Sequence, residues 1–201
     1  SKKYDGTALT KDAYTSDGLA TCDHIASVTV AGTITEIGTE SNVASGAVIK
    51  DEADADRTEN YAITYVPGTL EITANDDAIA IASASNTWEY DCSSHKDETY
   101  TVTYGGKAVT EVSADGKTFT LPTGDKLVIT STAAGVTYYD ATYSENNTFT
   151  FELENAAQYT GAKTTTFGTL SIDKKPLTIT AASDSKKYDG TALTKDAYTS
   201  D

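Results

Sequence analysis

The feature that most constrains this chain is an identical internal repeat. The segment SKKYDGTALTKDAYTSD occupies positions 1–17 and returns unchanged at 185–201, an offset of 185 − 1 = 184 residues. Chance does not produce such an identity in a chain of 201 residues. Repetition at a fixed period is typical of arrays in which each unit contacts its neighbours. We therefore interpret the chain as a window, one repeat unit plus an overlap, on a longer array.

A second, weaker repeat divides this unit into two related halves. Each half opens on a Tyr-Asp pair, at 4–5 and 90–91, and closes on a Gly-Thr-Leu-x-Ile segment, at 68–72 and 168–172. These marks predict three parts, which are a first module at 1–74, a second module at 75–174 and the start of the next copy of the first module at 175–201.

The phasing of these parts predicts that one strand is missing. The second module opens with an apolar strand near 78–82, and the segment 177–180 lies in the same way before Tyr188. Nothing comparable precedes Tyr4. An absent strand leaves backbone groups unpaired and a core uncovered. We expect residues that precede Ser1 in a longer chain to supply it; the alternative is a neighbouring chain.

Alternation of apolar and polar residues is the main secondary-structure signal. Such a period of two indicates strands with one buried face, and no window shows the 3.6-residue period of a helix with caps. Alternating positions occur at 149–154, 100–104, 170–173 and 177–180, at Val28 and Val30, and at Tyr61, Ile63 and Tyr65.

Turn residues lie between these segments. Gly105-Gly106 and Asp115-Gly116 suit tight hairpins, and Pro67-Gly68 suits a type II turn ahead of a strand. Short strands with frequent turns predict an all-β fold of tandem small β-sandwich-like modules, Ig-like or β-grasp-like, in a rod-like array.

Charge excludes several classes of partner. The chain carries 15 Lys and Arg against 30 Asp and Glu, a formal net charge of −15, and Arg57 is its only arginine. Nucleic-acid binding requires a basic surface, so no nucleic acid is expected. No apolar run approaches the roughly 20 residues of a membrane span, so no membrane insertion is expected either.

One acidic run is a candidate metal site. Asp51, Asp54 and Asp56 alternate along a polar segment, and calcium prefers several oxygen ligands from a flexible loop. The second module has no equivalent run, and no glycine stands where an EF-hand loop needs one. A solvated acidic loop is the competing interpretation. Calcium is therefore the single candidate, and we expect no other cofactor.

The two cysteines fall one in each module, at Cys22 and Cys92. They are too few for a disulfide framework, and no pair has the spacing of a zinc site. An extracellular setting would permit an inter-module disulfide between them, within one repeat unit or across two. Two separate thiols are the alternative.

The Tyr-Asp turns invite a catalytic interpretation, which we set aside. Their recurrence in every module favours a structural role, with Asp bonding the local backbone and Tyr packing as an anchor. No nucleophile elbow, phosphate loop or HExxH motif is present, so we expect no enzyme. The residues of these structural turns are Tyr4, Asp5, Gly6, Tyr90, Asp91, Tyr188, Asp189 and Gly190.

These marks together resemble the YDG and MBG-type repeats of large bacterial surface adhesins. The resemblance lies at 3–7, 18–20, 37–39, 59–61 and 68–72, and at 90–91, 124–125, 154–155 and 168–170. Trp88-Glu89 in place of Lys-Lys and Cys92 in place of Gly depart from the pattern. The resemblance implies long arrays on secreted or wall-anchored proteins, where such repeats serve as stalk or spacer modules.

We therefore predict a non-catalytic stalk or spacer repeat of a bacterial cell-surface adhesin or secreted fibre, at an extracellular location, whose partners are neighbouring copies docked head to tail. One alternative is a filament subunit completed by strand donation between neighbours. Another is a module that binds a glycan or a host protein in cell adhesion, because Tyr138, Tyr139 and Tyr143 could stack on sugar rings. Cross-strand packing of these tyrosines is the competing interpretation.

Overall fold

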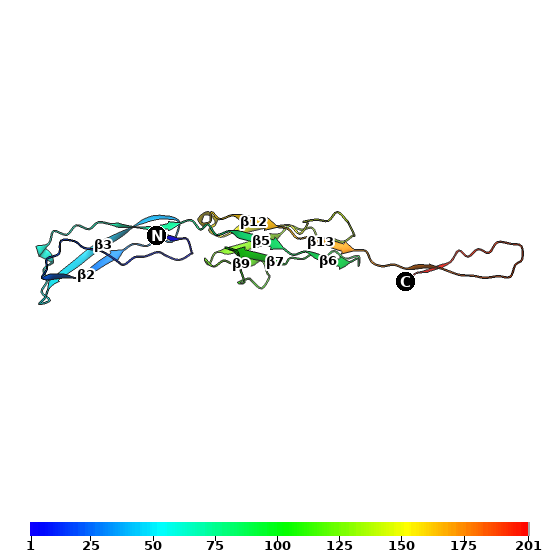
Figure 1. Cartoon of the computed structure of the whole chain (residues 1–201), viewed down its shortest axis with the longest axis horizontal. Coiled ribbons are helices and arrows are strands. Elements are labelled where there is room, and N and C mark those ends of the chain that lie inside the picture. Colours follow the sequence, from blue (N-terminus) through cyan, green and yellow to red (C-terminus); the bar gives the residue numbers. More distant parts are fainter. Residues whose placement is uncertain (201) are drawn as a thin grey trace.

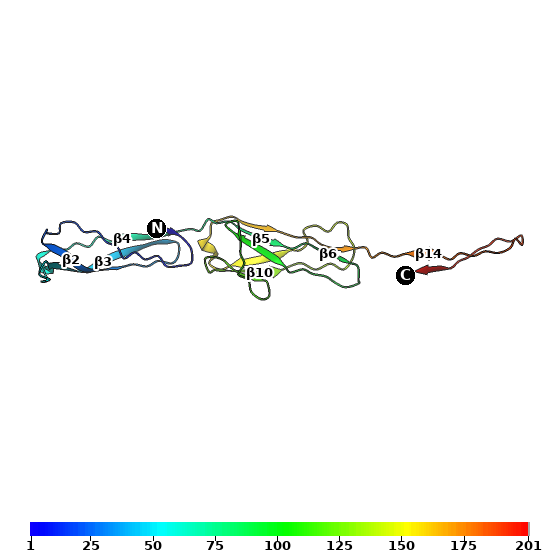
Figure 2. The same cartoon turned by 60° about the horizontal axis from the view of Figure 1, so that its bottom comes forward.

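The computed structural model describes residues 1–200. Over this range the chain is all β, and its helical segments are two single 3₁₀ turns, η1 (Thr58–Asn60) and η2 (Ala156–Gln158). None of the described residues belongs to a helix long and apolar enough to cross a membrane. The chain is long and narrow in both views, with the first module at one end, the second in the middle and a thin tail beyond it (Figures 1 and 2).

The first module contains one four-stranded sheet. Its strands are ordered β1 (Lys2–Lys3), β4 (Gly68–Thr73), β3 (Gly38–Asp51) and β2 (Asp23–Ala31). β1 pairs with β4 in parallel, whereas β3 pairs antiparallel with β4 and β2. Val28 and Val30 lie in β2 as predicted, and bulges interrupt the β2–β3 register on either side of Ser27.

The second module contains two larger sheets and a strand pair. The first sheet has the order β12 (Lys163–Thr166), β5 (Ile79–Ser83), β7 (Tyr100–Tyr104) and β8 (Lys107–Ala108). The second sheet has the order β11 (Phe149–Leu153), β10 (Lys126–Ser131) and β9 (Thr118–Thr120). β13 (Leu170–Asp173) pairs in parallel with β6 (Asn86–Glu89) at the end remote from the first module (Figure 1).

The main core lies between these two sheets. In β5, Ile79 and Ile81 are each 1% exposed, and they share one cluster with Leu127 and Ile129 of β10. The alternation of β5 sends these isoleucines to one face, and the flanking strands pair with both of its edges. β5 is therefore the strand around which the second module is packed.

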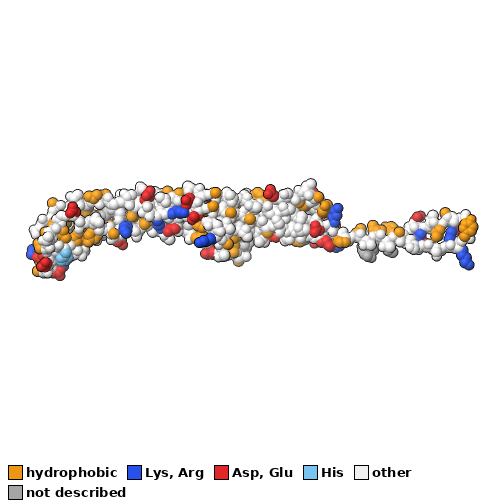
Figure 3. Space-filling view, viewed as in Figure 1, with side chains coloured by type: hydrophobic (Ala, Val, Ile, Leu, Met, Phe, Trp, Pro, Cys, Tyr) orange, Lys and Arg blue, Asp and Glu red, His pale blue; other side chains and the backbone are white. Residues whose placement is uncertain are grey.

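The tail beyond β13 makes one local pairing. β14 (Ile179–Ala181) pairs antiparallel with β15 (Tyr198–Ser200). Leu177 and Ile179 are 64% and 63% exposed, and Tyr188 is 97% exposed. Hydrophobic side chains lie in the open along this narrow extension (Figure 3). The tail thus carries a strand with an apolar pattern and no core to cover.

Most predicted strands are confirmed, and two details are wrong. Strands β7 and β13 coincide with predicted segments, and β5 supplies the predicted opening strand. The predicted alternating strand at 61–65 is not a strand, because no neighbouring strand pairs with it among the described residues. Gly68 begins β4 without the positive φ that the predicted type II turn requires.

Candidate functional site

The Tyr4-Asp5-Gly6 turn builds its own geometry. The Asp5 carboxylate accepts hydrogen bonds from the Thr7 backbone N–H at 2.9 Å and from Lys2 Nζ at 2.6 Å. Hydrogen bonding by Lys2 and Thr7 lowers the pKa of Asp5 to about 2. Gly6 follows at φ 77°, in the left-handed region that glycine tolerates best. The turn is thus fixed by local contacts before any neighbour is considered.

This turn docks on the second module. The Tyr4 ring is 4% exposed and meets the Tyr159 ring edge to face, with centroids 5.7 Å apart. Tyr4 Oη donates to Asp125 Oδ1 at 3.3 Å, and the Tyr159 hydroxyl donates to the other oxygen of the same carboxylate. We call Asp125 and Tyr159 the acceptor pair of the second module.

Burial sets the protonation of these groups. Asp125 is 5% exposed, and Asn155 Nδ2 donates to it at 2.8 Å, so the carboxylate is fully engaged by donors. Burial, and then the hydrogen bond to Asp125, raise the pKa of Tyr159, and the same two causes raise the pKa of Tyr4. Both hydroxyls therefore stay protonated as donors at neutral pH.

Close backbone contact completes the junction. A Cβ placed on Gly6 would lie 1.8 Å from the Thr123 carbonyl oxygen, so no side chain fits there. Asn75 Nδ2 donates to the Tyr4 carbonyl at 2.8 Å and also to the Tyr104 hydroxyl. The side chain of Asn75 thus joins the turn of the first module to β7 of the second.

The first module carries an acceptor pair of its own at its far end. Tyr61 Oη donates to Asp23 Oδ2 at 2.6 Å, as Tyr159 does to Asp125. Each tyrosine directly follows a 3₁₀ turn, and that hydrogen bond is the main cause of the raised pKa of Tyr61. Asp23 begins β2, at the end of the chain opposite the second module (Figure 1).

The second module carries a turn of the same kind, Tyr90-Asp91-Cys92, at its end remote from the first module. We call this turn and Tyr4-Asp5-Gly6 the docking turns of the two modules. Tyr90 N donates to Asp173 O at 3.0 Å, as Tyr4 N donates to Thr73 O at 2.9 Å. Asp91 accepts from Ser93 N at 2.8 Å, and a hydrogen bond from His95 is the main cause of its lowered pKa. In the tail, Asp189 accepts from Thr191 N at 2.9 Å, so the third turn has the same local structure.

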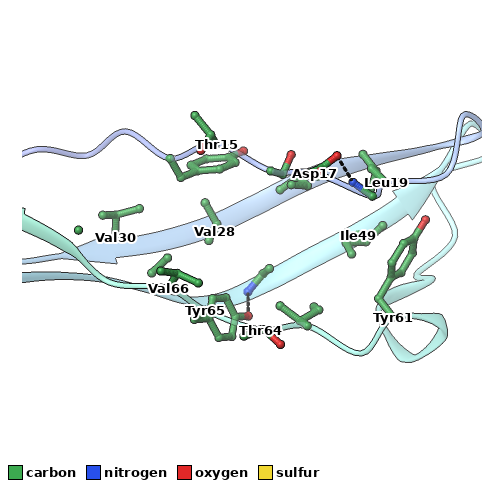
Figure 4. A pocket seen from close by; sticks show the side chains of 18 of the residues that line it. Thr15, Asp17, Leu19, Val28, Val30, Ile49, Tyr61, Thr64, Tyr65 and Val66 are labelled. Atoms are coloured by element: carbon green, nitrogen blue, oxygen red, sulfur yellow. Dashed lines mark hydrogen bonds between the residues drawn. The ribbon is translucent and has the colours of Figure 1, made fainter.

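A groove of about 870 Å³ lies in the first module (Figure 4). Its floor is formed by Val28 and Val30 of β2 and Ile49 of β3, and its walls are the segments 13–19 and 61–68. Within these walls, residues 13–19 and 61–67 are extended chain without strand pairing among the described residues, and Gly68 begins β4. Tyr14, Ile63 and Val66 of the walls are therefore exposed to solvent, whereas Ile49 of the floor is buried.

The groove occupies the place that β5 fills in the second module. There β5 lies between β7, which follows the docking turn, and β12, which precedes Gly168. The corresponding segments of the first module, after its docking turn and before Gly68, are the two walls of the groove. The groove thus lies where the second module has β5.

Two pairs of equivalent residues, Asn147 with Asn42 and Gly168 with Gly68, differ in their contacts at this position. Asn147 Nδ2 donates to Ala84 O, at the end of β5, and to Asp97 O. Its counterpart Asn42 pairs with Gly68 in the sheet, and Asn42 Nδ2 donates to Lys11 O, the equivalent of Asp97 O. A Cβ on Gly168 would lie 2.1 Å from Ala84 O, whereas a Cβ on Gly68 meets nothing closer than 3.8 Å.

The acidic run does not assemble a metal site. Asp51 accepts from Ala53 N and Ala55 N, each at 2.9 Å, and pairs with Arg57 at 2.6 Å. Asp56 accepts from Thr58 N at 2.8 Å, and Asp54 lies in the exposed part of the loop. Among the described residues, no three His, Cys, Asp or Glu side chains are placed to share a metal ion. The geometry gives calcium no support.

Of the remaining predicted residues, the two cysteines, Tyr138 and Tyr139 are exposed. Cys22 and Cys92 are free thiols at opposite ends of the two-module body, so they are not bonded to each other within one chain. Tyr138 and Tyr139 are 67% and 47% exposed, and Lys174 Nζ lies 4.5 Å from the centre of the Tyr139 ring. Tyr143 packs in part against Leu170 and Ile172. They form no groove for a sugar among the described cavities.

Sequence reasoning missed the acceptor pairs. Tyr61 and Tyr159 were visible as a shared Glu-Asn mark followed by tyrosine, but nothing in the sequence tied them to Asp23 and Asp125. A comparison of Thr21-Cys22-Asp23 with Thr123-Gly124-Asp125 could have suggested the link. Comparison of the chain with protein-family models, curated proteins and solved structures found no match.

Proposed function

We propose that the chain is a non-catalytic structural repeat, a stalk or spacer whose β-sandwich-like modules dock head to tail in a rod-like array. The observation that carries this proposal is the buried junction of Tyr4 with Asp125 and Tyr159. Both of its halves recur at the free ends, as the Tyr90 turn and the Asp23–Tyr61 pair. A contact that recurs in this way propagates in one direction without closing on itself.

The resemblance to YDG and MBG-type repeats supports an extracellular setting on a bacterial surface protein. The acidic surface fits this role, because copies of net charge −15 repel one another except where specific contacts hold them. Each junction buries a tyrosine against its neighbour and so limits bending between modules. The function is mechanical, in that the array would hold a binding region away from the cell.

A matched pair of substitutions tests the rod. Gly6→Ala places a methyl group 1.8 Å from Thr123 O, whereas Gly190→Ala introduces it in an equivalent turn with nothing within 4 Å. The two glycines have φ of 77° and 78°, so the local strain is the same in both variants. We expect small-angle scattering to show Gly6→Ala with a bent, broadened distribution of shapes and Gly190→Ala unchanged from the parent. Equal profiles for all three proteins would contradict docking at Tyr4.

The groove favours a second candidate, in which one copy completes another by strand donation. We assign the donor as 177–183 of a second copy. Ile179 and Ser183 stand where β5 has Ile79 and Ser83, at the same offset that relates Ile72 to Ile172. In β5, Ser83 Oγ donates to Asn147 O at 2.6 Å and accepts from Gly168 N at 2.9 Å. The first module offers the counterparts of both partners at Asn42 and Gly68.

Sedimentation separates the two candidates. Strand donation between chains predicts oligomers that grow with protein concentration and are abolished by Ile179→Asp. Attaching residues 174–184 ahead of Ser1 would fill the groove from within the same chain and should leave a monomer. A parent chain that stays monomeric at high concentration would sink donation between chains and leave the stalk proposal standing.

A further inference from the structure

Head-to-tail docking of consecutive repeat units would place the two cysteines on the two sides of their junction. Cys92 follows Tyr90-Asp91 as Gly6 follows Tyr4-Asp5, and its φ of 68° matches the 77° of Gly6. Cys22 directly precedes the acceptor carboxylate of Asp23, as Gly124 precedes that of Asp125. Where the contact inside this chain has two glycines, the next contact has two cysteines.

The geometry of the glycine junction shows how near these positions come. An ideal Cβ on Gly6 lies 1.8 Å from the oxygen, 2.9 Å from the carbonyl carbon and 3.6 Å from the Cα of Thr123. The position of Cys22 can be aligned in two ways. The turn hydrogen bond runs from Asp23 N to Ala20 O in the first module and from Gly124 N to Leu121 O in the second, which aligns Cys22 with Thr123. Counted back from the acceptor carboxylate, Cys22 aligns with Gly124. Aligned with Thr123, Cys22 lies at the residue that faces Gly6; aligned with Gly124, it lies one residue further along, where an added Cβ has nothing within 4 Å.

We propose that a disulfide between Cys92 of one unit and Cys22 of the next unit closes this junction. The inference rests on the head-to-tail docking proposed above. Disulfides require Cα atoms about 4.4–6.8 Å apart, which places a Cβ on one residue a few ångströms from the Cα of the other. The spacing at Gly6 and Thr123 has this order. A Cβ at this position overlaps the Thr123 carbonyl group, so the cysteine junction must be wider at this point than the glycine junction.

Three features agree with a covalent junction. Cys92 adopts a left-handed conformation that favours glycine, so its cysteine is not explained by the turn. Both thiols are exposed in this chain, as unjoined halves of a contact would be. Asn75, which holds the glycine junction through Tyr4 and Tyr104, is replaced by Lys175 at the corresponding place after β13. The disulfide therefore replaces the contact that Asn75 makes in the glycine junction.

The chemistry needs an external oxidant. The two thiols together lose two protons and two electrons, an S–S bond forms, and a small disulfide such as oxidised glutathione accepts the electrons and leaves as two thiols. An extracellular setting supplies such conditions. The resulting array alternates non-covalent glycine junctions with covalent cysteine junctions, one of each per repeat unit.

The test uses the chain extended by a second copy through its shared segment, so that residues 1–184 are followed by a complete copy of 1–201. After equilibration in a glutathione redox buffer, non-reducing peptide mapping should find Cys92 of the first copy joined to Cys22 of the second. The outer Cys22 and outer Cys92 should remain free thiols. Four free thiols, or mixed pairings among all four, would overturn the proposal.

A control moves one thiol without changing their number. Cys92→Ser combined with Ala114→Cys in the first copy keeps an exposed thiol but places it in a surface turn away from the docking end, and we expect its bridge to the second copy to fall at least tenfold. Scattering of the reduced two-copy protein separates the two failures. If peptide mapping finds only free thiols and the reduced protein is a straight rod, the disulfide alone is refuted. If the thiols are free and the reduced protein is bent, head-to-tail docking is refuted as well.

Discussion

In the second module, β5 lies between β7 and β12 and buries Ile79 and Ile81 at 1% exposure. In the first module the same position is a groove, and the side chains that would face the strand are open, with Val66 80% exposed and Tyr65 39% exposed. Among the described residues, the buried hydrophobic side chains of the first module are Tyr4, Ile49, Leu70 and Ile72, and two of these, Tyr4 and Ile72, belong to the cluster shared with the second module.

The difference teaches where the stability of a repeat of this kind lies. The presence of one five-residue strand, β5 in the second module, decides whether two sheet faces enclose a core. The first module keeps its β2–β3–β4 sheet by backbone pairing and by its junction with the second module. The second module holds a complete core within its own residues and the Ile72 and Tyr4 contacts. Four predictions follow from this difference, and three of them compare a substitution with the same substitution at the equivalent position elsewhere in the chain.

The largest effect is expected from truncating the central strand. Ile81→Ala removes a fully buried side chain and should lower the free energy of unfolding of the second module by about 2–5 kcal/mol. Ile179→Ala, in the corresponding strand of the tail, removes an exposed side chain and should leave urea unfolding of the isolated chain unchanged. Equal losses in both variants would mean that the tail strand is already buried, against the structure described here.

A second matched pair concerns the glycine before the closing strand. Gly168→Ala drives a methyl group to 2.1 Å from Ala84 O and should destabilise the second module by about 1–3 kcal/mol. Gly68→Ala has open space at the same position and should unfold like the parent in the isolated chain. Once residues 174–184 are attached ahead of Ser1, Gly68→Ala should become as costly. If it stays neutral there, the groove is not a strand position.

The sequence predicted the repeat, the all-β fold and the strands that carry their own alternation, such as β7. It could not predict that 61–65 would be unpaired, because alternation records which face of a strand is buried and not whether a partner is present. Nor could it predict the acceptor pairs. Tyr159 and Asp125 are 34 residues apart, and only the folding of β10 and β11 into one sheet brings them together. The expectation that the first module lacks an opening strand came from the phasing of the repeat, and the groove lies where the second module has β5.

A third prediction tests the junction by the pH dependence of stability. The pKa values of Tyr4 and Tyr159 are raised in the folded protein, while an unfolded tyrosine ionises near pH 10. Their contribution is therefore fully present below about pH 10 and is lost as pH rises toward the folded pKa values. Thermal melting between pH 8 and 11.5 should show stability falling above pH 10. Tyr159→Phe, weaker at neutral pH, should show a flatter decline; a parallel decline would assign the effect to other groups.

The smallest effect is expected from a single hydroxyl. Tyr4→Phe keeps the ring packed on Tyr159 and removes one hydrogen bond of 3.3 Å, a long contact, so the loss should be near the lower end of about 0.5–1.5 kcal/mol. The loss is limited further because Asp125 keeps its bonds from Tyr159 and Asn155. Tyr188→Phe makes the same change in an identical turn that is 97% exposed and should cost nothing measurable. Paired urea titrations resolve the difference, and a larger loss at Tyr188 than at Tyr4 would mean that the tail turn, and not the junction, uses its hydroxyl.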